Sequence, residues 1–183
     1  MNLFCPRLRR ALVALALLLP GAAAPALAHV RGAARVPAVP LAQALPRPAL
    51  TPGAIDPAVT QDDLDRTICR PGYSRAVRPP ERYTERLKRR QMRQYGWADR
   101  RLRDYEEDHL ISLELGGSPT DPRNLWPQPH HVVGGWGSYA KDKLENRLHA
   151  LVCRGALPLR IAQHAIATDW IGAYRRWVGA TPR

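Results

Sequence analysis

The sequence has little cysteine and no apolar run long enough to cross a membrane. Its 183 residues include three cysteines, none in a Cys-X-X-Cys pair, so the structural zinc site that such pairs build is absent. The one long apolar run, residues 11–19, is well short of the roughly 20 residues that a spanning helix needs. The length is that of about one domain, which excludes a multidomain assembly.

Acidic residues are also scarce. There are 28 lysines and arginines against 16 aspartates and glutamates, giving a net charge of +12 with histidine neutral. This balance excludes an acidic, self-solvating tail protein. It favours partners that carry negative charge, such as nucleic acids or anionic polymers.

The first 28 residues have the pattern of a secretory signal peptide. Arg7, Arg9 and Arg10 precede the apolar run 11–19, and the small-residue triplet 26–28 follows it, as a cleavage site requires. Removing residues 1–28 leaves 25 basic and 16 acidic side chains, a net charge of +9. We therefore expect a basic protein that is periplasmic or secreted and that is not inserted in a membrane after cleavage.

Two cysteines remain once Cys5 has left with the signal peptide, namely Cys69 and Cys153. In an oxidising compartment an even pair favours a disulfide over a metal site or a reactive thiol. Closing so long a loop stabilises by about 4 kcal/mol in the chain-entropy account. The alternative is a pair of free, buried thiols.

Aromatic residues are absent from residues 29–60, which are rich in alanine and proline. This composition predicts a disordered or extended linker. All eleven tryptophans and tyrosines lie between Tyr73 and Trp177. We therefore place a single folded domain at residues 61–183.

Three helices are predicted within this domain. The first covers residues 85–95, with Thr84 as its N-cap and Gly96 as its stop. The second begins with Ser138 as its N-cap, continues to Val152 and carries an apolar stripe opposite a polar face. The third begins at Pro158, and its apolar residues recur at helical spacing to Trp177.

Residues compatible with β-strands occur at 105–115 and 125–126, separated by a turn-rich loop. Together with the helices they predict an α+β fold in the order strand, loop, short strand, helix. The first strand carries Asp108 and His109. Neighbouring strand residues point to opposite faces unless the strand ends or bulges there.

These residues suit metal-dependent hydrolysis of phosphodiesters. Asp108 is a candidate ligand for a hard divalent cation, and His109 is a candidate general base, since an imidazole is largely unprotonated at neutral pH. The metal would stabilise the charge that develops on the phosphate. Asn124 is a candidate either for orienting the imidazole or for helping to hold the metal.

At these positions the sequence resembles the HNH endonucleases, which belong to the His-Me finger (ββα-metal) nucleases. The matching residues are Asp108–His109, Gly116–Gly117 and Asn124–Leu125, within a stretch from Tyr105 to Cys153. The resemblance implies a ββα-metal core with additional flanking helices. A closer resemblance, to small exported bacterial HNH-like proteins, implies a cysteine pair as well and extends over residues 67–73, 124–127 and 141–142.

The sequence departs from the HNH pattern at the last metal ligand, which is usually a histidine near the start of the final helix. The helix here offers Asp142, Glu145 and Asn146 on one face. Oxygen ligands favour Mg²⁺, with Mn²⁺ or Ca²⁺ as alternatives, over zinc. His130 and His131, in a loop, are competing candidates.

A basic run precedes the first strand, and arginines and lysines of this kind bind phosphates without reading sequence. Tyr95 and Trp97 are interleaved with this run and favour a nucleic-acid track over a merely solvated surface. The candidate nucleic-acid-binding residues are Arg86, Lys88, Arg89, Arg90, Arg93, Arg100, Arg101 and Arg103.

The leading hypothesis is therefore an exported, monomeric, metal-dependent endonuclease. It would hydrolyse DNA, with RNA as a further candidate, at low sequence specificity, and an inhibitor protein is a candidate partner. A second hypothesis is an inactive HNH-like scaffold that binds nucleic acid or an anionic envelope polymer, because fold does not guarantee activity. A third is an exported interaction protein whose tryptophan-rich helices pack against a partner.

Overall fold

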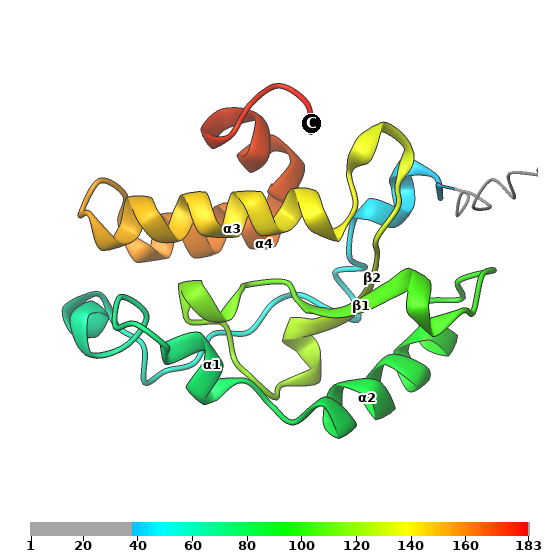
Figure 1. The fold of residues 1–183 in the computed structure, drawn as a ribbon, viewed down its shortest axis with the longest axis horizontal. Helices are drawn as coiled ribbons and strands as arrows, with labels where there is room; N and C mark the ends of the chain where they lie inside the picture. The colour runs from blue at the N-terminus through cyan, green and yellow to red at the C-terminus, as the bar shows by residue number, and fades with distance from the viewer. Residues whose placement is uncertain (1–37, 183) are drawn as a thin grey trace, which may run out of the picture. The chain divides into compact units, whose positions relative to one another are not determined.

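The computed structural model describes residues 38–182 as a mixture of helix and strand (Figure 1). A two-stranded antiparallel sheet pairs β1 (Tyr105–His109) with β2 (Leu125–Pro129). Helix α3 (Ser138–Cys153) follows β2. The α+β class and the order strand, loop, strand, helix are thereby confirmed. The predicted signal peptide 1–28 and the first part of the predicted linker lie outside the described residues.

The β1–β2 connection is a folded loop rather than a continuation of the first strand to residue 115. A 3-10 helix forms at Leu113–Leu115, and the glycine pair after it permits a tight return. Gly116 has a φ of +72°, and a Cβ on Gly117 would lie 1.7 Å from the carbonyl oxygen of Ile111. Only glycine fits such a close approach of backbone to backbone.

The ends of two helices can be compared with the prediction. Helix α2 covers Glu81–Gln94 and begins after Pro80, so Thr84 lies inside it and bonds the Glu81 carbonyl instead of capping. The chain leaves this helix at Gly96, whose φ is +63°. Helix α4 (Leu159–Trp177) begins after Pro158 as predicted.

The remaining helical segments are short. Helix α1 covers Tyr73–Val77. None of the helices in the described part of the chain is both long and apolar enough to span a membrane. Single 3-10 turns cover Leu41–Ala44 (η1), Gln61–Arg66 (η2), Leu102–Asp104 (η3), Leu113–Leu115 (η4), Pro122–Asn124 (η5) and Val133–Gly135 (η6).

Apolar side chains pack in two clusters. The larger lies mainly between α3 and α4, where Leu144, Leu148 and Ile166 are fully buried. The smaller lies between α2 and the sheet and contains Tyr95 and Trp97, which are 0% and 5% exposed. These two aromatic side chains are therefore core residues, and the prediction that they interleave a nucleic-acid surface is wrong.

Residues 38–60 pack along the domain, so of the two predicted alternatives, a disordered or an extended linker, the disordered one does not hold for this segment. Ala44, Thr51 and Val59 are buried. Val39 pairs with Val132, and the indole of Trp170 donates to the Ala44 carbonyl. Prolines fix an extended backbone whose remaining polar groups bond to neighbouring segments. A scarcity of aromatic residues indicates irregular structure, and it does not exclude burial of small side chains.

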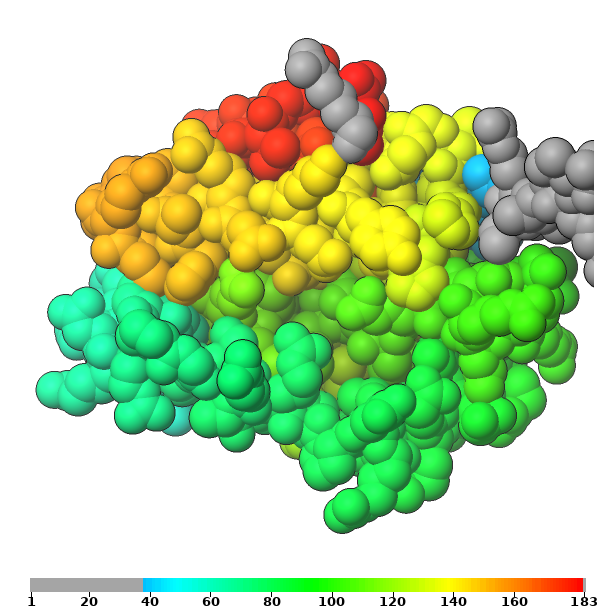
Figure 2. Space-filling model, in the orientation of Figure 1, coloured from blue at the N-terminus to red at the C-terminus, as the bar shows by residue number. Residues whose placement is uncertain are grey.

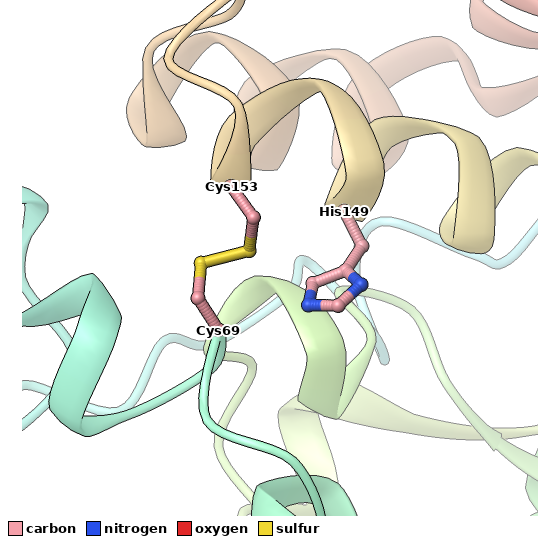
Figure 3. A group of neighbouring side chains, drawn as sticks. All are labelled: Cys69, His149 and Cys153. Atoms are coloured by element: carbon pink, nitrogen blue, oxygen red, sulfur yellow. A yellow bond between two sulfur atoms is a disulfide. The ribbon is translucent and has the colours of Figure 1, made fainter.

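The predicted disulfide joins Cys69 to Cys153, with Cα atoms 5.6 Å apart, so the alternative of free thiols is wrong. It ties the segment before α1 to the end of α3, 84 residues later (Figure 3). His149 lies beside the two sulfur atoms, and its Nε2 is 2.9 Å from the Ile68 carbonyl oxygen. The two sulfurs are bonded to each other, which leaves no thiolate for a metal.

Replacing both cysteines with serine is expected to lower the free energy of unfolding by roughly 2–4 kcal/mol, because the unfolded chain regains the freedom of a long loop. Urea denaturation of the oxidised protein and of the double variant measures this. Adding a reductant should destabilise the wild type to a similar extent and leave the variant unchanged. Equal stabilities of the oxidised protein and the variant would contradict the prediction.

Candidate active site

The end of β1 and the first turns of α3 enclose a small polar pocket of about 60 Å³. Asp108 and His109 line it from β1, while Asp142 and Glu145 line it from α3. His109 is the last residue of its strand, and it borders the same pocket as its neighbour. Residues that lie 33 or more positions apart in the sequence are thereby brought together. The full lining comprises Arg78, Glu106, Asp108, His109, Ser112, Leu113, Glu114, Asp142 and Glu145.

A fully buried lysine connects the two elements. Lys141 Nζ donates to Asp108 Oδ2 and to the His109 carbonyl oxygen, both at 2.7 Å, and also to the Glu145 carboxylate. Burial alone would lower the pKa of Lys141, but the carboxylates of Asp108 and Glu145 outweigh burial, so the pKa is raised. Lys141 is thus a fixed cation at neutral pH.

The carboxylates around the pocket repel one another. Burial, followed by the charges of Asp108 and Asp142, raises the pKa of Glu106 to about 7. The pKa of Asp142 is raised by burial and then by Asp108. Burial also raises the pKa of Glu145, against the opposing charge of Lys141. Burial is thus the largest cause of each of these shifts, and the neighbouring carboxylates add to it.

His109 is held as a neutral imidazole. Its Nε2 lies 3.0 Å from the Pro119 carbonyl oxygen, and because a carbonyl only accepts, the proton is on Nε2 and the lone pair on Nδ1. Burial lowers the pKa of His109. A buried, neutral and oriented imidazole is the form that a general base requires.

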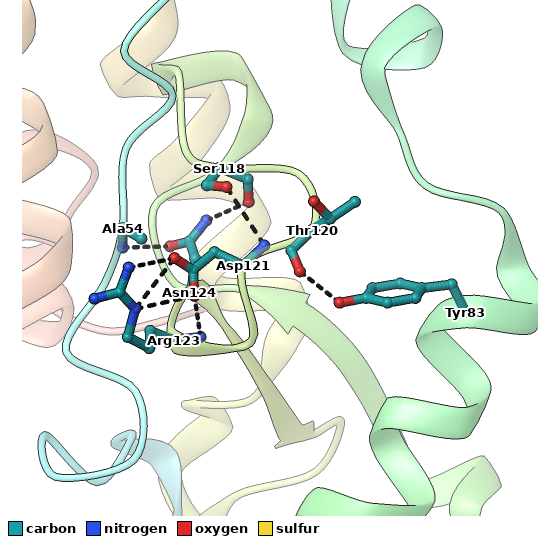
Figure 4. A network of polar contacts seen from close by, with 7 residues as sticks. All are labelled: Ala54, Tyr83, Ser118, Thr120, Asp121, Arg123 and Asn124. Atoms are coloured by element: carbon teal, nitrogen blue, oxygen red, sulfur yellow. Dashed lines mark hydrogen bonds and ion pairs between the residues drawn. The ribbon is translucent and has the colours of Figure 1, made fainter.

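Asn124 shapes the loop that carries this carbonyl and does not itself bond the imidazole. Its side chain is fully buried, and its Nδ2 donates to the carbonyl oxygen of Ile111 at 3.0 Å. The same Nδ2 donates to the Ser118 carbonyl oxygen at 3.1 Å (Figure 4). Its Oδ1 accepts from the backbone N–H of Ile111 and of Ala54. These four bonds are to backbone groups, so its orienting effect on His109 is exerted through the loop.

The pocket's donor set has the chemistry of a site for a hard divalent cation, but its ligand atoms are not gathered around one point. Among the described residues, the group of three such side chains whose ligand atoms lie within 4.8 Å of one another is Cys69, His149 and Cys153. Carboxylates from β1, α3 and the intervening loop face it, and Mg²⁺, Mn²⁺ and Ca²⁺ prefer such oxygen ligands. Lys141 engages one oxygen of Asp108, Oδ2. A cation at this place would offset the part of the pKa shifts of Glu106 and Asp142 that the charge of Asp108 adds to the effect of burial.

The structure brings some of the predicted ligands to the pocket and leaves others away from it. Asp142 and Glu145 line it, whereas Asn146 does not and instead donates to the backbone oxygen of Asp142. His130 and His131 are not among the lining residues either. His130 Nδ1 is 2.8 Å from the hydroxyl of Ser138.

Of the predicted nucleic-acid-binding residues, Lys88 is buried and the arginines are exposed. Lys88 is buried and forms an ion pair with Glu85, while its Nζ also donates to the Tyr105 carbonyl oxygen. It is therefore not part of the basic surface, because its position in α2 faces the sheet. Arg101 is paired with Asp99 and Asp104. The residues exposed as expected are Arg86, Arg89, Arg90, Arg93, Arg100, Arg101 and Arg103.

Sequence reasoning missed four residues of the site. Glu106 is two positions from Asp108 on a strand, a spacing that puts both on one face. Lys141 precedes Glu145 by four positions on a helix, which is the spacing of an ion pair. Arg78 and Glu114 reach the pocket from outside the sheet and α3. Their sequence spacing from the other site residues does not predict that they lie there.

No protein-family model, curated protein or solved structure matches the chain. The basis for assigning a function is therefore the chemistry of the pocket and its surroundings.

Next to this pocket, Glu107 is 9% exposed, and neither of its carboxylate oxygens has a hydrogen-bond partner among the described residues. Burial raises the pKa of Glu107 to about 9, and the nearby Lys88 only partly opposes this. The folded state therefore keeps a proton that the unfolded chain has lost above pH 5. It follows that stability falls as the pH rises from about 5 to about 9.

The variant Glu107→Gln is expected to weaken this decline, by at most about 1.4 kcal/mol per pH unit. Urea unfolding between pH 5 and pH 8, in EDTA, measures the slopes for both proteins. Glu81→Gln, at the exposed start of α2, is the matched control and should follow the wild type. Parallel curves for wild type and Glu107→Gln would contradict the assignment of a buried, protonated carboxyl.

Proposed function

We propose that the protein is a metal-dependent endonuclease that hydrolyses phosphodiester bonds in DNA or RNA with low sequence specificity. In this proposal β1, β2 and α3 form a ββα-metal core of the HNH type, and the protein acts in the periplasm or outside the cell, where its disulfide persists. The observation that carries the proposal is the neutral, oriented His109 at the edge of a carboxylate pocket.

His109 would act as the general base. With Nε2 bonded to the Pro119 carbonyl, Nδ1 is the nitrogen able to accept a proton from the attacking water. The low pKa that burial gives the imidazole keeps this nitrogen unprotonated at neutral pH. The same carbonyl bond fixes the plane of the ring, so no reorientation is needed as the proton moves.

Asp108, Asp142 and Glu145 would hold the metal, with Mg²⁺ as the best fit to an all-oxygen set. When bound, such a cation stabilises charge on the phosphate and on the leaving oxygen. Lys141 would orient two of these carboxylates through its bonds to Asp108 and Glu145. Arg78, at the pocket rim, would pair with a phosphate of the substrate.

Substrate binding would depend on the exposed arginines of α2 and of the segment after it. Contacts of this kind go to phosphates, so affinity is expected to fall steeply with salt and to vary little with sequence. Seven of the eight predicted residues are exposed. Low sequence specificity follows from this mode of binding.

The central prediction is that His109→Ala lowers cleavage of supercoiled plasmid by 10²-fold or more, the usual contribution of a general base. The purified, oxidised protein is tested with Mg²⁺, Mn²⁺ or EDTA, and DNA binding is measured in EDTA. His164→Ala, at an exposed histidine of α4, is the control and should cleave as the wild type does. Undiminished cleavage by His109→Ala would exclude this mechanism.

Metal binding is tested by a matched pair on α3. Asp142→Asn is expected to raise the Mg²⁺ concentration needed for half-maximal cleavage by about tenfold or more, since it removes a charged ligand from the pocket. Asn146→Ala should leave it unchanged, because Asn146 does not line the pocket. Calorimetric titration of both variants with Mn²⁺ checks binding independently of cleavage. A larger effect of Asn146→Ala than of Asp142→Asn would contradict the prediction and would identify Asn146 as the last metal ligand.

A second function has an observation in its favour. Lys141 supplies a positive charge between Asp108 and Glu145, as it would in an inactive HNH-like scaffold that binds nucleic acid or an anionic envelope polymer. Salt-sensitive binding with no product under any metal would support the scaffold. Cleavage that EDTA abolishes and Mg²⁺ restores would eliminate it.

A further inference from the structure

Three aromatic rings gather where β2 passes into α3, outside the carboxylate pocket. The ring of His130 stacks on Tyr139, with centroids 5.3 Å apart and planes inclined by 17°. His131 contacts the same tyrosine at 6.2 Å. Tyr139 is 58% exposed. We call His130, His131 and Tyr139 the aromatic shelf.

The shelf is anchored through His130. The backbone N–H of His130 donates to the Asp104 carbonyl oxygen at 2.9 Å, and its ring Nδ1 is 2.8 Å from the hydroxyl of Ser138. Ser138 is itself buried and begins α3. An exposed tyrosine stacked on an anchored ring is a preformed flat surface, so little conformational freedom is lost when a ligand stacks on it.

His130 lies at the border of two hollows. One, of about 390 Å³, runs along α2 and β1 and includes Arg78, Lys88 and His109 in its wall. The other, of about 330 Å³, is lined by His131, Tyr139 and Lys143. In the space-filling view the surface is hollowed between α2 and α3 (Figure 2). The candidate base and the aromatic shelf therefore line connected stretches of one surface.

We propose that the aromatic shelf binds an unpaired nucleobase, so that the substrate of the His109 site is a single-stranded polynucleotide. This rests on the proposed nuclease function and adds the strandedness of its substrate. One base would stack on Tyr139, and the strand would continue past His130 into the hollow that reaches His109.

The chemistry of stacking favours a single strand over a duplex. The faces of bases within a duplex are covered by their neighbours, whereas an unpaired base presents a free face to an aromatic side chain. Stacking of this kind is tolerant of sequence, in agreement with binding dominated by phosphates. Both hollows have the size of a site for a small organic ligand. Lys143 lies in the wall of the hollow beside Tyr139, and the wall of the other hollow contains the exposed Arg78 together with Glu81, Glu85, Glu106 and Glu107.

The test measures fluorescence anisotropy of a labelled 20-nucleotide DNA strand, the RNA strand of the same sequence and the corresponding DNA duplex, all in EDTA. The full protein should bind the single strands more tightly than the duplex. Tyr139→Ala should weaken single-strand binding by roughly tenfold or more, the usual effect of losing one stacked base. Tyr139→Phe, which keeps the ring, should remain within about twofold of the wild type. Ile161→Ala, at an exposed residue of α4, controls for loss of a surface apolar group.

Equal affinity for strand and duplex, or no effect of Tyr139→Ala on single-strand binding, would overturn the inference. If the wild type binds the DNA and RNA strands with different affinities, and Tyr139→Ala weakens binding of both, the result would support the inference. The strand that is bound more tightly then identifies the preferred sugar. Because these measurements contain no metal, they are independent of cleavage. If single-strand binding depends on Tyr139 but no metal yields a cleavage product, the proposed hydrolytic function is wrong and the inferred binding of an unpaired base still holds.

Discussion

The buried ammonium of Lys141 is the interaction on which the site depends. It bonds the Asp108 side chain, the His109 backbone and the Glu145 side chain, and thus couples the end of β1 to α3. Taking a charge out of water is costly unless partners compensate it, and loss of one partner leaves the others buried and unpaired. The relative placement of strand and helix is therefore specified by charge as well as by the apolar cluster beneath α3.

A second constraint acts on the loop between the strands. Asn124 bonds four backbone groups of its surroundings, and Gly117 lets the chain pass close enough for these bonds to form. The loop so fixed carries the Pro119 carbonyl that orients His109. A residue that touches no reacting atom can thus determine which imidazole nitrogen is free. The effect is positional, through backbone, and explains why an amide with two donors and one acceptor oxygen suits this place.

Local patterns predicted local structure, and they failed where long-range packing decides. Helical periodicity indicated α3, but the prediction of Ser138 as its N-cap is wrong, because Gly137 is the N-cap and Ser138 is the first helical residue. Thr84 fitted a cap rule, yet Pro80 starts the helix earlier because proline is tolerated where no N–H bond is needed. The ion pair of Lys141 with Asp108 joins residues 33 positions apart, and no periodicity reports such a contact. The packing of residues 38–60 was not predicted, because their composition indicates a lack of regular secondary structure and carries no information about burial.

The distribution of charge has a consequence for the proposed chemistry. The chain as a whole is basic, which attracts a polyanion to its surface, but the pocket beside His109 has five carboxyl groups and two cations. A phosphate approaching His109 therefore meets repulsion just where it would react. The pKa values of Glu106 and Asp142 are raised first by burial and then by the neighbouring charge of Asp108. In the proposed nuclease, a divalent cation among these carboxylates would offset this repulsion, because it would neutralise the acids and attract the phosphate. In the proposed nuclease, attack by a water at His109 would therefore require a metal in the pocket. The carboxyl groups concerned are those of Glu106, Asp108, Glu114, Asp142 and Glu145.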